Sequence, residues 1–369
     1  MYNFTRYSTF LEVDSMRTIA WCIILIGLPL NLFLIGYTMW ESVMNKYSIV
    51  RREYHHRSAV TLTNPSIWLL FNLFVCDFIG STYVLILVVS DSYYTQYNQN
   101  VYGLNATFSL IKNEWSTSPT CDVAQFLANI YLFVAVTLTM CIGIDRFILT
   151  AHPHSSKKIT IKRAKVITVV TWITGLVVIS GIVIFNIVNF HLRSEYYFEF
   201  YRNLCLGEYY LTTVHTVLAF IQLDYYMIVY SAVTVIYAII VWKLRKSRLT
   251  FRSQLSSTFE RRFQIMLTLI TLTNVFASLF ISTATAVSLL NGKPTQITKF
   301  QKILTLFPYS NTALDPMVCL IFRFNDFSGV SRQLYCQSMI SKCFYPKVNS
   351  IAVVETKTSQ LDNVAASEV

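Results

Sequence analysis

Charged residues are scarce in this 369-residue chain and make up 13% of it. A soluble domain carries roughly a quarter charged residues, so the composition excludes an ordinary soluble protein. Histidine is also rare, and the six histidines are scattered along the sequence. That scatter excludes the clustered histidine ligands of a membrane metalloenzyme. Because no nucleophile–base pair is evident either, the sequence predicts a protein that is not an enzyme and binds no metal or cofactor.

Hydrophobic residues are what the chain has in abundance, at 54% of the sequence and with a mean hydropathy of +0.47. Seven apolar runs each exceed the roughly 20 residues that cross a bilayer core. They cover residues 18–40, 66–90, 121–149, 164–188, 212–242, 263–290 and 300–322. The sequence therefore predicts an all-α membrane protein with a seven-transmembrane helix bundle and with its termini on opposite sides.

The distribution of Lys and Arg sets the expected orientation. With the N-terminus outside, the inner segments hold 22 of the 30 basic residues and the outer segments hold 8. Because basic residues concentrate on the cytoplasmic side, this asymmetry favours an extracellular N-terminus. The net charge of +11 then suits anionic membrane lipid, and its spread over four loops argues against a nucleic-acid partner. Glycosylation sequons at Asn3 and Asn105 fall on the predicted outer side.

One polar pair ends the third apolar run. Asp145 and Arg146 are followed by Phe147, and Arg146 comes 25 positions after Cys121. Other runs carry their own landmarks, namely Asn31, Asn72, Asp77, Trp172, Tyr237, Asp315 and Pro316. In this order and spacing, these residues resemble the landmarks of rhodopsin-like (class A) G protein-coupled receptors over about residues 18–340.

Some positions depart from the family pattern and indicate a divergent member. The run at 263–290 lacks the family's Trp and Pro and offers Phe276 and Phe280 instead. Cys319 replaces the tyrosine of the Asn-Pro-x-x-Tyr motif in the last run. The Asp-Pro form of that motif is similar to the purine, lipid and peptide receptor branches, and a chemosensory receptor fits as well.

The resemblance implies a plasma-membrane receptor that binds an extracellular ligand and activates heterotrimeric G proteins. Arg146 would pair with Asp145 at rest, and on activation it would move to Tyr237 and open a groove for a G-protein helix. Protonation of Asp145 is a plausible trigger. The same switch would include four further residues, Asp77, Asn311, Asp315 and Pro316.

Asp77 is costly inside an apolar run, and an ionisable residue there is by default functional. The resemblance brings Asp77 and Asp315 close together, where two carboxylates cannot both ionise easily. The family often holds sodium at this place with a hydroxyl, but the matching position here is Ala135. A polar network with Asn31 and Asn311, or a buried acid without a switching role, stays open.

The resemblance also implies modifications and a domain order. It implies a disulfide between Cys121 and Cys205, for which the residues alone leave two free thiols as the alternative. Palmitoylation is expected at Cys336 and Cys343. The expected parts are an extracellular N-terminus (1–17), the bundle (18–322), an amphipathic membrane-surface helix (323–340) and a disordered cytoplasmic tail (341–369).

Evidence for the ligand is limited to residue types. Ala128 replaces the acid of amine receptors and Tyr309 replaces the retinal lysine of opsins, so both classes are excluded. Asp224 would either receive a cationic group or pair with a polar neighbour. The expected pocket residues are Gln125, Asn129, Leu132, His215, Asp224, Tyr225, Thr283, Lys302, Thr305 and Tyr309. Aromatic outer loops favour a peptide ligand or, equally, anchoring at the membrane interface, so the ligand is a peptide or a small molecule.

Further partners are expected at the end of the chain. The last residues, Ser-Glu-Val, suit a PDZ-domain protein, and the tail's Ser and Thr residues suit kinases that recruit arrestin. The alternatives to a signalling receptor are a non-signalling seven-span ligand-binding (decoy) protein and a membrane transporter. Intact Arg146 argues against the decoy, and the lack of internal repeats argues against the transporter.

Overall fold

The computed structural model describes most of the membrane region. It covers residues 14–48, 62–101, 115, 118–151, 158–188, 204–206, 213–247, 263, 265–277 and 305–322. The chain divides into two units, Met1–Phe322 and Arg323–Val369, and all the described residues belong to the first unit. The expected amphipathic helix and tail therefore lie outside the described residues.

The described residues are mostly helical. The five long helices are α1 (Asp14–Ser48), α2 (Pro65–Val101), α4 (Pro119–Ala151), α5 (Ile161–Val188) and α7 (Thr213–Ser247). Two shorter helices follow at Ile265–Ala277 and at 307–322. Each of the seven falls on one of the seven predicted spans, so the prediction of an all-α seven-helix bundle is confirmed.

The long helices are apolar enough to cross a membrane. Each of the five contains a segment with the length and hydropathy of a membrane span, and Ile265–Ala277 is a shorter apolar helix. Helix α2 continues to Val101, well beyond the span predicted to end at residue 90. Hydrophobicity marks the part of a helix that meets lipid, whereas the end of a helix depends on local polar contacts.

Two helices begin at a polar residue followed by proline. Before α2, the Asn64 side chain accepts a hydrogen bond from the backbone N–H of Ser66 at 3.0 Å. Before α4, the Ser118 hydroxyl accepts one from the backbone N–H of Cys121 at 3.2 Å. Proline fits the first helical position because its missing N–H would have no partner there. These caps fix Ser66 and Cys121 in the first turns of their helices.

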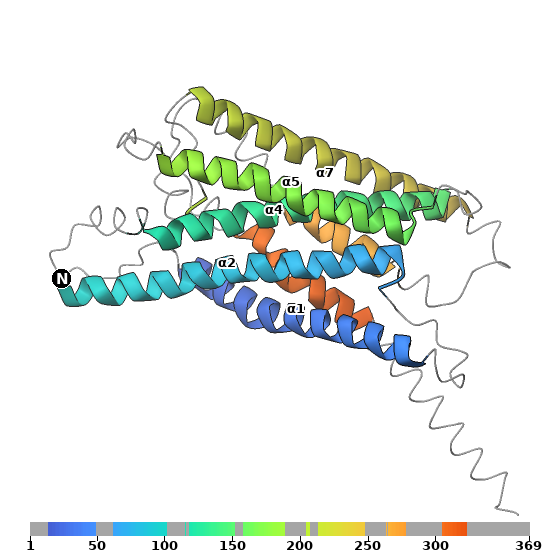
Figure 1. The fold of residues 1–369 in the computed structure, drawn as a ribbon, viewed down its shortest axis with the longest axis horizontal. Coiled ribbons are helices and arrows are strands. Elements are labelled where there is room, and N and C mark those ends of the chain that lie inside the picture. Colours follow the sequence, from blue (N-terminus) through green and yellow to red (C-terminus); the bar gives the residue numbers. More distant parts are fainter. Residues whose placement is uncertain are drawn as a thin grey trace, which may run out of the picture. The chain divides into compact units, whose positions relative to one another are not determined.

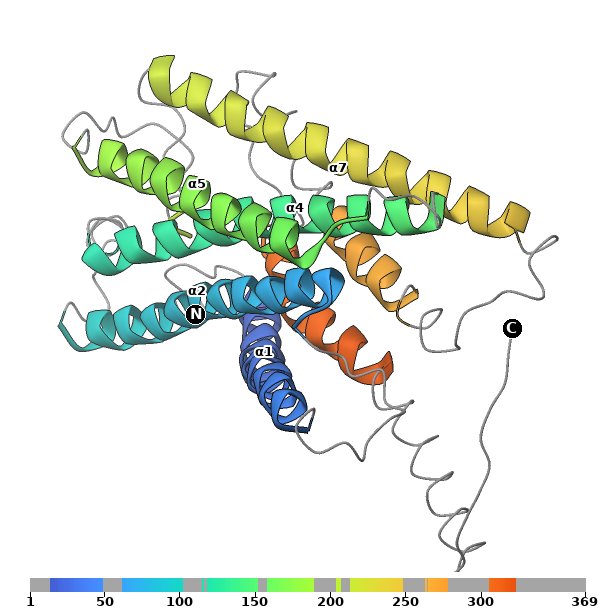
Figure 2. The same cartoon turned by 45° about the vertical axis from the view of Figure 1, so that its right-hand side comes forward.

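Helix α4 is the central element of the bundle. It packs against α2, α5 and α7, while α1 packs against α2, and both views of the ribbon show α4 between α2 on one side and α7 on the other (Figures 1 and 2). The outward face of α5 carries exposed aliphatic side chains such as Val166, Val170, Ile173 and Val177. That face suits contact with lipid, so the polar groups of the bundle meet in its interior.

The last helix lies very close to α1. A Cβ atom added to Gly27 would come within 2.9 Å of the Thr312 carbonyl oxygen, so only glycine permits this approach. Pro316 has no N–H to bond that carbonyl, which lies four residues earlier in the helix. The amide of Asn31 donates to it instead, at 2.7 Å. Asn31 thus joins α1 to the backbone of helix 307–322.

Candidate functional site

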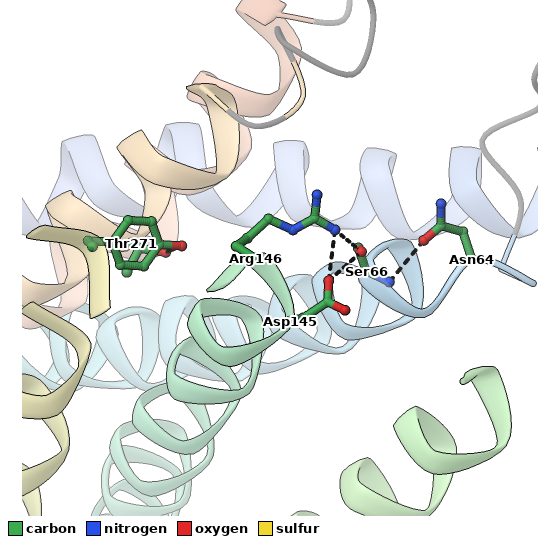
Figure 3. A network of polar contacts seen from close by, with 6 residues as sticks. Asn64, Ser66, Asp145, Arg146 and Thr271 are labelled. Atoms are coloured by element: carbon green, nitrogen blue, oxygen red, sulfur yellow. Dashed lines mark hydrogen bonds and ion pairs between the residues drawn. The ribbon is translucent and has the colours of Figure 1, made fainter. Parts of the chain in front are cut away.

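The C-terminal part of α4 carries a buried ion pair, and a third residue bonds to both of its members. The Asp145 carboxylate accepts a hydrogen bond from the Arg146 guanidinium at 2.8 Å and another from the Ser66 hydroxyl at 2.6 Å. Arg146 also donates to the Ser66 oxygen. All three residues are buried, and Figure 3 shows the closed triangle that they form. We call this set of Asp145, Arg146 and Ser66 the latch.

Two other elements complete the surroundings of Arg146. The phenyl ring of Phe263 lies 5.3 Å from the guanidinium carbon, which is a cation–π distance. Ser66 holds its place because Asn64 caps the start of α2. Arg146 therefore contacts residues of α4, α2 and the segment before helix Ile265–Ala277. Sequence reasoning identified the pair but missed Ser66, which lies 79 residues from Asp145.

Tyr237 is engaged elsewhere in this arrangement. Its hydroxyl shares a hydrogen bond with that of Thr271 at 2.8 Å, joining α7 to helix Ile265–Ala277. The guanidinium of Arg146 points toward Asp145 and Ser66 and away from Thr271 (Figure 3). Gly143 lies beside the tyrosine ring, where an added Cβ would sit 3.4 Å away. In this arrangement Arg146 is bonded to Asp145 and Ser66, and Tyr237 is bonded to Thr271.

A second polar cluster joins the two shorter helices. The Asn274 amide donates to Asp315 at 2.7 Å, and Asn311 donates to the Asn274 carbonyl oxygen at 3.1 Å. Thr273 also donates to Asp315, at 3.3 Å. Asn311 and Asp315 were expected in a polar network, whereas Asn274 and Thr273 were missed because their partners lie about forty residues away.

Asp77 is also a buried acid of the bundle, and it differs from Asp315 in its hydrogen bonds. Its side chain is fully buried, and neither carboxylate oxygen has a hydrogen-bond partner among the described residues. Asp315 is close enough to act on Asp77 electrostatically. The structure thus brings the two acids near each other, while Asp315 alone is held by hydrogen bonds.

The disulfide between Cys121 and Cys205 is present, with the two Cα atoms 5.4 Å apart. Tyr83 adds a second attachment, since its hydroxyl donates to the Leu204 carbonyl at 2.7 Å. Cys205 has a positive φ of 51°, a conformation that is uncommon outside glycine and is held here by these attachments. The predicted disulfide is confirmed, and Tyr83 is a contact that the sequence did not reveal.

Tyr83 also belongs to a group of three buried tyrosines. The ring of Tyr309 lies 4.7 Å from that of Tyr83 and 5.3 Å from that of Tyr131, measured between centroids. Tyr131 donates to the Pro308 carbonyl at 2.9 Å. Tyr309 and the neighbouring Thr305, both expected in the pocket, are therefore buried in the bundle.

Other expected pocket residues meet between α4 and α7. Asn129 accepts a hydrogen bond from Gln222 at 3.2 Å, and Gln222 also donates to Tyr226 at 2.9 Å. Tyr225 shares a hydrogen bond with Thr137 at 2.6 Å. Gln125 is buried and Leu132 partly buried on α4. Sequence reasoning did not identify Gln222 and Tyr226. The amide side chain of Gln222 inside an apolar run could have indicated a polar contact between helices.

Two residues that the sequence singled out are exposed. Asp224 lies on the exposed side of α7 and has no hydrogen bond or ion pair to another described residue. Phe276 is 52% exposed. One residue turns the direction of a side chain on a helix by about 100°, so the sequence alone does not fix the face that a residue occupies.

Several predicted positions lie outside the described residues. They are Asn3, Asn105, Phe280, Thr283, Lys302, Cys336, Cys343 and the side chain of His215. An ion pair that the sequence did not predict lies at the opposite end of α2 from the latch. Arg17 of α1 reaches Asp91 of α2 at 2.8 Å, which ties the two helices together.

The family profile described as 7 transmembrane receptor (rhodopsin family) matches residues 54–318. Comparison with curated proteins gives no match. The matched range runs from before α2 into the last helix and includes both polar clusters and the disulfide. Members of this family are signalling receptors of the plasma membrane that span it several times, bind extracellular ligands and act through G proteins; they are not enzymes. The chain belongs to the rhodopsin family of seven-transmembrane receptors.

Proposed function

We propose that this receptor activates heterotrimeric G proteins when ligand binding releases Arg146 from the latch. The observation that carries the proposal is the buried contact of Arg146 with both Asp145 and Ser66. Breaking a buried pair of this kind leaves charges uncompensated, so the closed state is stabilised as long as the latch is intact. Tyr237, bonded to Thr271 at rest, is the proposed new partner of the freed guanidinium.

A ligand shifts such an equilibrium only if it binds the open state more tightly than the closed one. Neutralising Asp145 would weaken the closed state because the Arg146 guanidinium would lose its charged partner. The variant Asp145→Asn imitates that neutralisation while it keeps the size of the side chain.

The first prediction compares three variants in cells without added ligand. Asp145→Asn is expected to raise G-protein activation by about tenfold, the effect of losing roughly 1.4 kcal/mol of stabilisation of the closed state. Arg146→Ala is expected to abolish activation. The control is Arg163→Ala, which removes an exposed basic residue at the start of α5 and should leave signalling unchanged.

The measurement is G-protein dissociation across all Gα classes at matched surface expression. Equal output from wild type, Asp145→Asn and Arg146→Ala in every class would refute coupling through the latch. The receptor would then be a ligand-binding protein without signalling. A transporter would instead show uptake of solute that depends on neither variant.

The proposed ligand site lies between α4 and α7 at Asn129, Gln222 and Tyr226. These groups are neutral hydrogen-bond donors and acceptors, and buried Ala128 occupies the place of an acid. We infer a ligand with neutral hydrogen-bonding groups, either a small molecule or part of a peptide. Gln125, Leu132, Tyr225, Thr305 and Tyr309 belong to the same proposal.

The remaining parts of the proposal concern modification and intracellular partners. Asn3 and Asn105 are proposed glycosylation sites, and Cys336 and Cys343 are proposed palmitoylation sites. Phosphorylated Ser and Thr residues of the tail would recruit arrestin, and the Ser-Glu-Val sequence would bind a PDZ domain. Each is supported by the sequence and by the orientation that the distribution of Lys and Arg predicts.

A further inference from the structure

Helix Ile265–Ala277 belongs to a run that lacks the residues on which the movement of this helix usually depends in the family. In this family a Trp and a Pro belong to the sixth span, but the corresponding run at 263–290 contains neither residue. Prolines are the usual cause of a sharp helix bend. Something other than a proline-dependent bend must therefore control how this helix rests against its neighbours.

Asn274 of helix Ile265–Ala277 makes three hydrogen bonds. Its amide donates to Asp315 at 2.7 Å and to the Ile270 carbonyl of its own helix at 2.9 Å. Its carbonyl oxygen accepts from Asn311 at 3.1 Å. Both amide hydrogens and the oxygen are thus engaged, and two of the three bonds cross to helix 307–322.

The polar groups around the Asp315 carboxylate also come from helix Ile265–Ala277. One of its carboxylate oxygens accepts from Asn274. The other lies 3.3 Å from the Thr273 hydroxyl, whose single hydrogen also has the Ile270 carbonyl at 2.8 Å. Asp315 and Asn274 are buried at 0% and 3% exposure. A buried carboxylate is costly unless it is hydrogen-bonded, and hydrogen bonds to an ionised group are stronger than neutral ones. Moving the helix away from 307–322 would leave this carboxylate without its donors.

The same helix has two other polar or charged contacts nearer the latch. Phe263, just before it, lies against the Arg146 guanidinium, and Thr271 is bonded to Tyr237. Together with the bonds of Asn274, these contacts reach three different elements, namely α4, α7 and helix 307–322. All three exist together with the closed latch, and a contact stabilises the arrangement in which it forms.

We propose that Asn274 is a positioning residue whose bonds to Asp315 and Asn311 restrain helix Ile265–Ala277 in the resting receptor. We call these three residues the clasp. Opening the clasp separates the two helices and favours the released form of the latch. The inference rests on the proposed function where it concerns signalling, and on the hydrogen bonds alone where it concerns helix position.

A reciprocal exchange tests the clasp. Asn274→Asp removes the amide donor to Asp315 and places a second acid there. Because two buried carboxyl groups this close cannot both ionise easily, the contact with helix 307–322 is weakened. Asp315→Asn keeps a neutral amide that still accepts from Asn274. The double variant, which combines Asn274→Asp with Asp315→Asn, restores one carboxylate facing two amide donors, those at positions 311 and 315.

The expected order of ligand-independent signalling follows from these pairings. Asn274→Asp should exceed wild type by about tenfold, since hydrogen bonds to charged groups are the strong ones. Asp315→Asn should rise by about threefold or less because only the charge assistance is lost. The double variant should return close to wild type. A matched control is Phe276→Leu, on the exposed face of the same helix, with no expected change.

A second readout follows the helix without any G protein. A fluorophore sensitive to its surroundings is attached to Ile265→Cys, an exposed position at the start of the helix. Cys22, Cys336 and Cys343 are replaced by serine in this background. In purified receptor, Asn274→Asp should shift the emission and the double variant should reverse the shift.

The two readouts separate the possible failures. If Asp145→Asn raises signalling but Asn274→Asp changes neither signalling nor emission, the clasp is refuted and the coupling proposal stands. If emission shifts as expected while no variant changes signalling, coupling is refuted and the clasp stands. Lower signalling from well-expressed Asn274→Asp, or no recovery of signalling and emission in the double variant, would also overturn the clasp.

Discussion

At the scale of single residues, the main finding is that the latch has three members. Ser66 touches both charged groups, so its hydroxyl stabilises the ion pair from a different helix. The net contribution of a side-chain hydrogen bond is about 0.5–1.5 kcal/mol. The latch is therefore sensitive to the position of α2 as well as to the charge of Asp145.

The second prediction concerns this hydroxyl. Ser66→Ala is expected to raise ligand-independent signalling by about threefold, less than Asp145→Asn, because the Asp145–Arg146 pair remains. Ser66→Thr keeps the hydroxyl and should resemble wild type. Both are measured by G-protein dissociation at matched surface expression. Identical output from the alanine and threonine variants would rule out the hydroxyl as the cause.

Sequence reasoning reached part of this site. Asp145 and Arg146 are neighbours in the chain, so their pairing needs no knowledge of the fold. Ser66 and Asn274 were missed because their partners come close only after the helices pack. The pairing of Cys121 with Cys205 was predicted because the family resemblance, rather than the local sequence, connects them.

At the scale of helices, close packing depends on particular glycines. In α1, a Cβ on Gly27 would approach the Ser81 hydroxyl to 2.8 Å and the Thr312 carbonyl oxygen to 2.9 Å, whereas Gly36 has no atom within 4 Å of that position. The two glycines lie in the same helix and differ only in what they face. They form a natural pair for comparison.

The third prediction uses this pair. Gly27→Ala is expected to destabilise the receptor by about 1–3 kcal/mol because a backbone carbonyl must move. Gly36→Ala should be neutral or slightly stabilising, since alanine favours helix by up to about 1 kcal/mol. Thermal unfolding of the purified, full-length protein measures both. A lower melting temperature for Gly36→Ala than for Gly27→Ala would contradict the packing described.

Helix positions were predicted well and helix faces less well. The apolar runs located all seven helices because lipid requires long hydrophobic segments. Asp224, expected in the pocket, and Phe276 both lie on exposed faces of their helices. In a helix that is apolar all round, hydrophobicity does not distinguish the lipid-facing side from the packed side.

At the scale of the whole molecule, composition predicted the class, and the distribution of Lys and Arg predicts the orientation. Scarce charge and long apolar runs already exclude a soluble fold. The asymmetry of Lys and Arg favours an N-terminus on the outside. Neither property depends on the contacts between helices, which is why these predictions needed no structural detail.

The fourth prediction tests the orientation. Asn3 and Asn105 should carry glycans, since both precede the outer side of a span in the assigned topology. Digestion of the cell-surface protein with an N-glycosidase should increase its electrophoretic mobility, and the double variant Asn3→Gln with Asn105→Gln should lose that shift. A surface protein whose mobility is unchanged by digestion would contradict glycosylation at both sites. Antibody labelling of an N-terminal epitope on intact cells then checks the orientation separately.

The hydrogen bond from Asn31 to the Thr312 carbonyl affects how easily helix 307–322 bends. At Pro316 the last helix lacks the internal bond that would resist bending, and the freed carbonyl is held by α1 instead. Bending there stretches a contact between two helices rather than one within a helix. The local stiffness of helix 307–322 is therefore set in part by its neighbour, so a change in α1 alters how readily the last helix flexes.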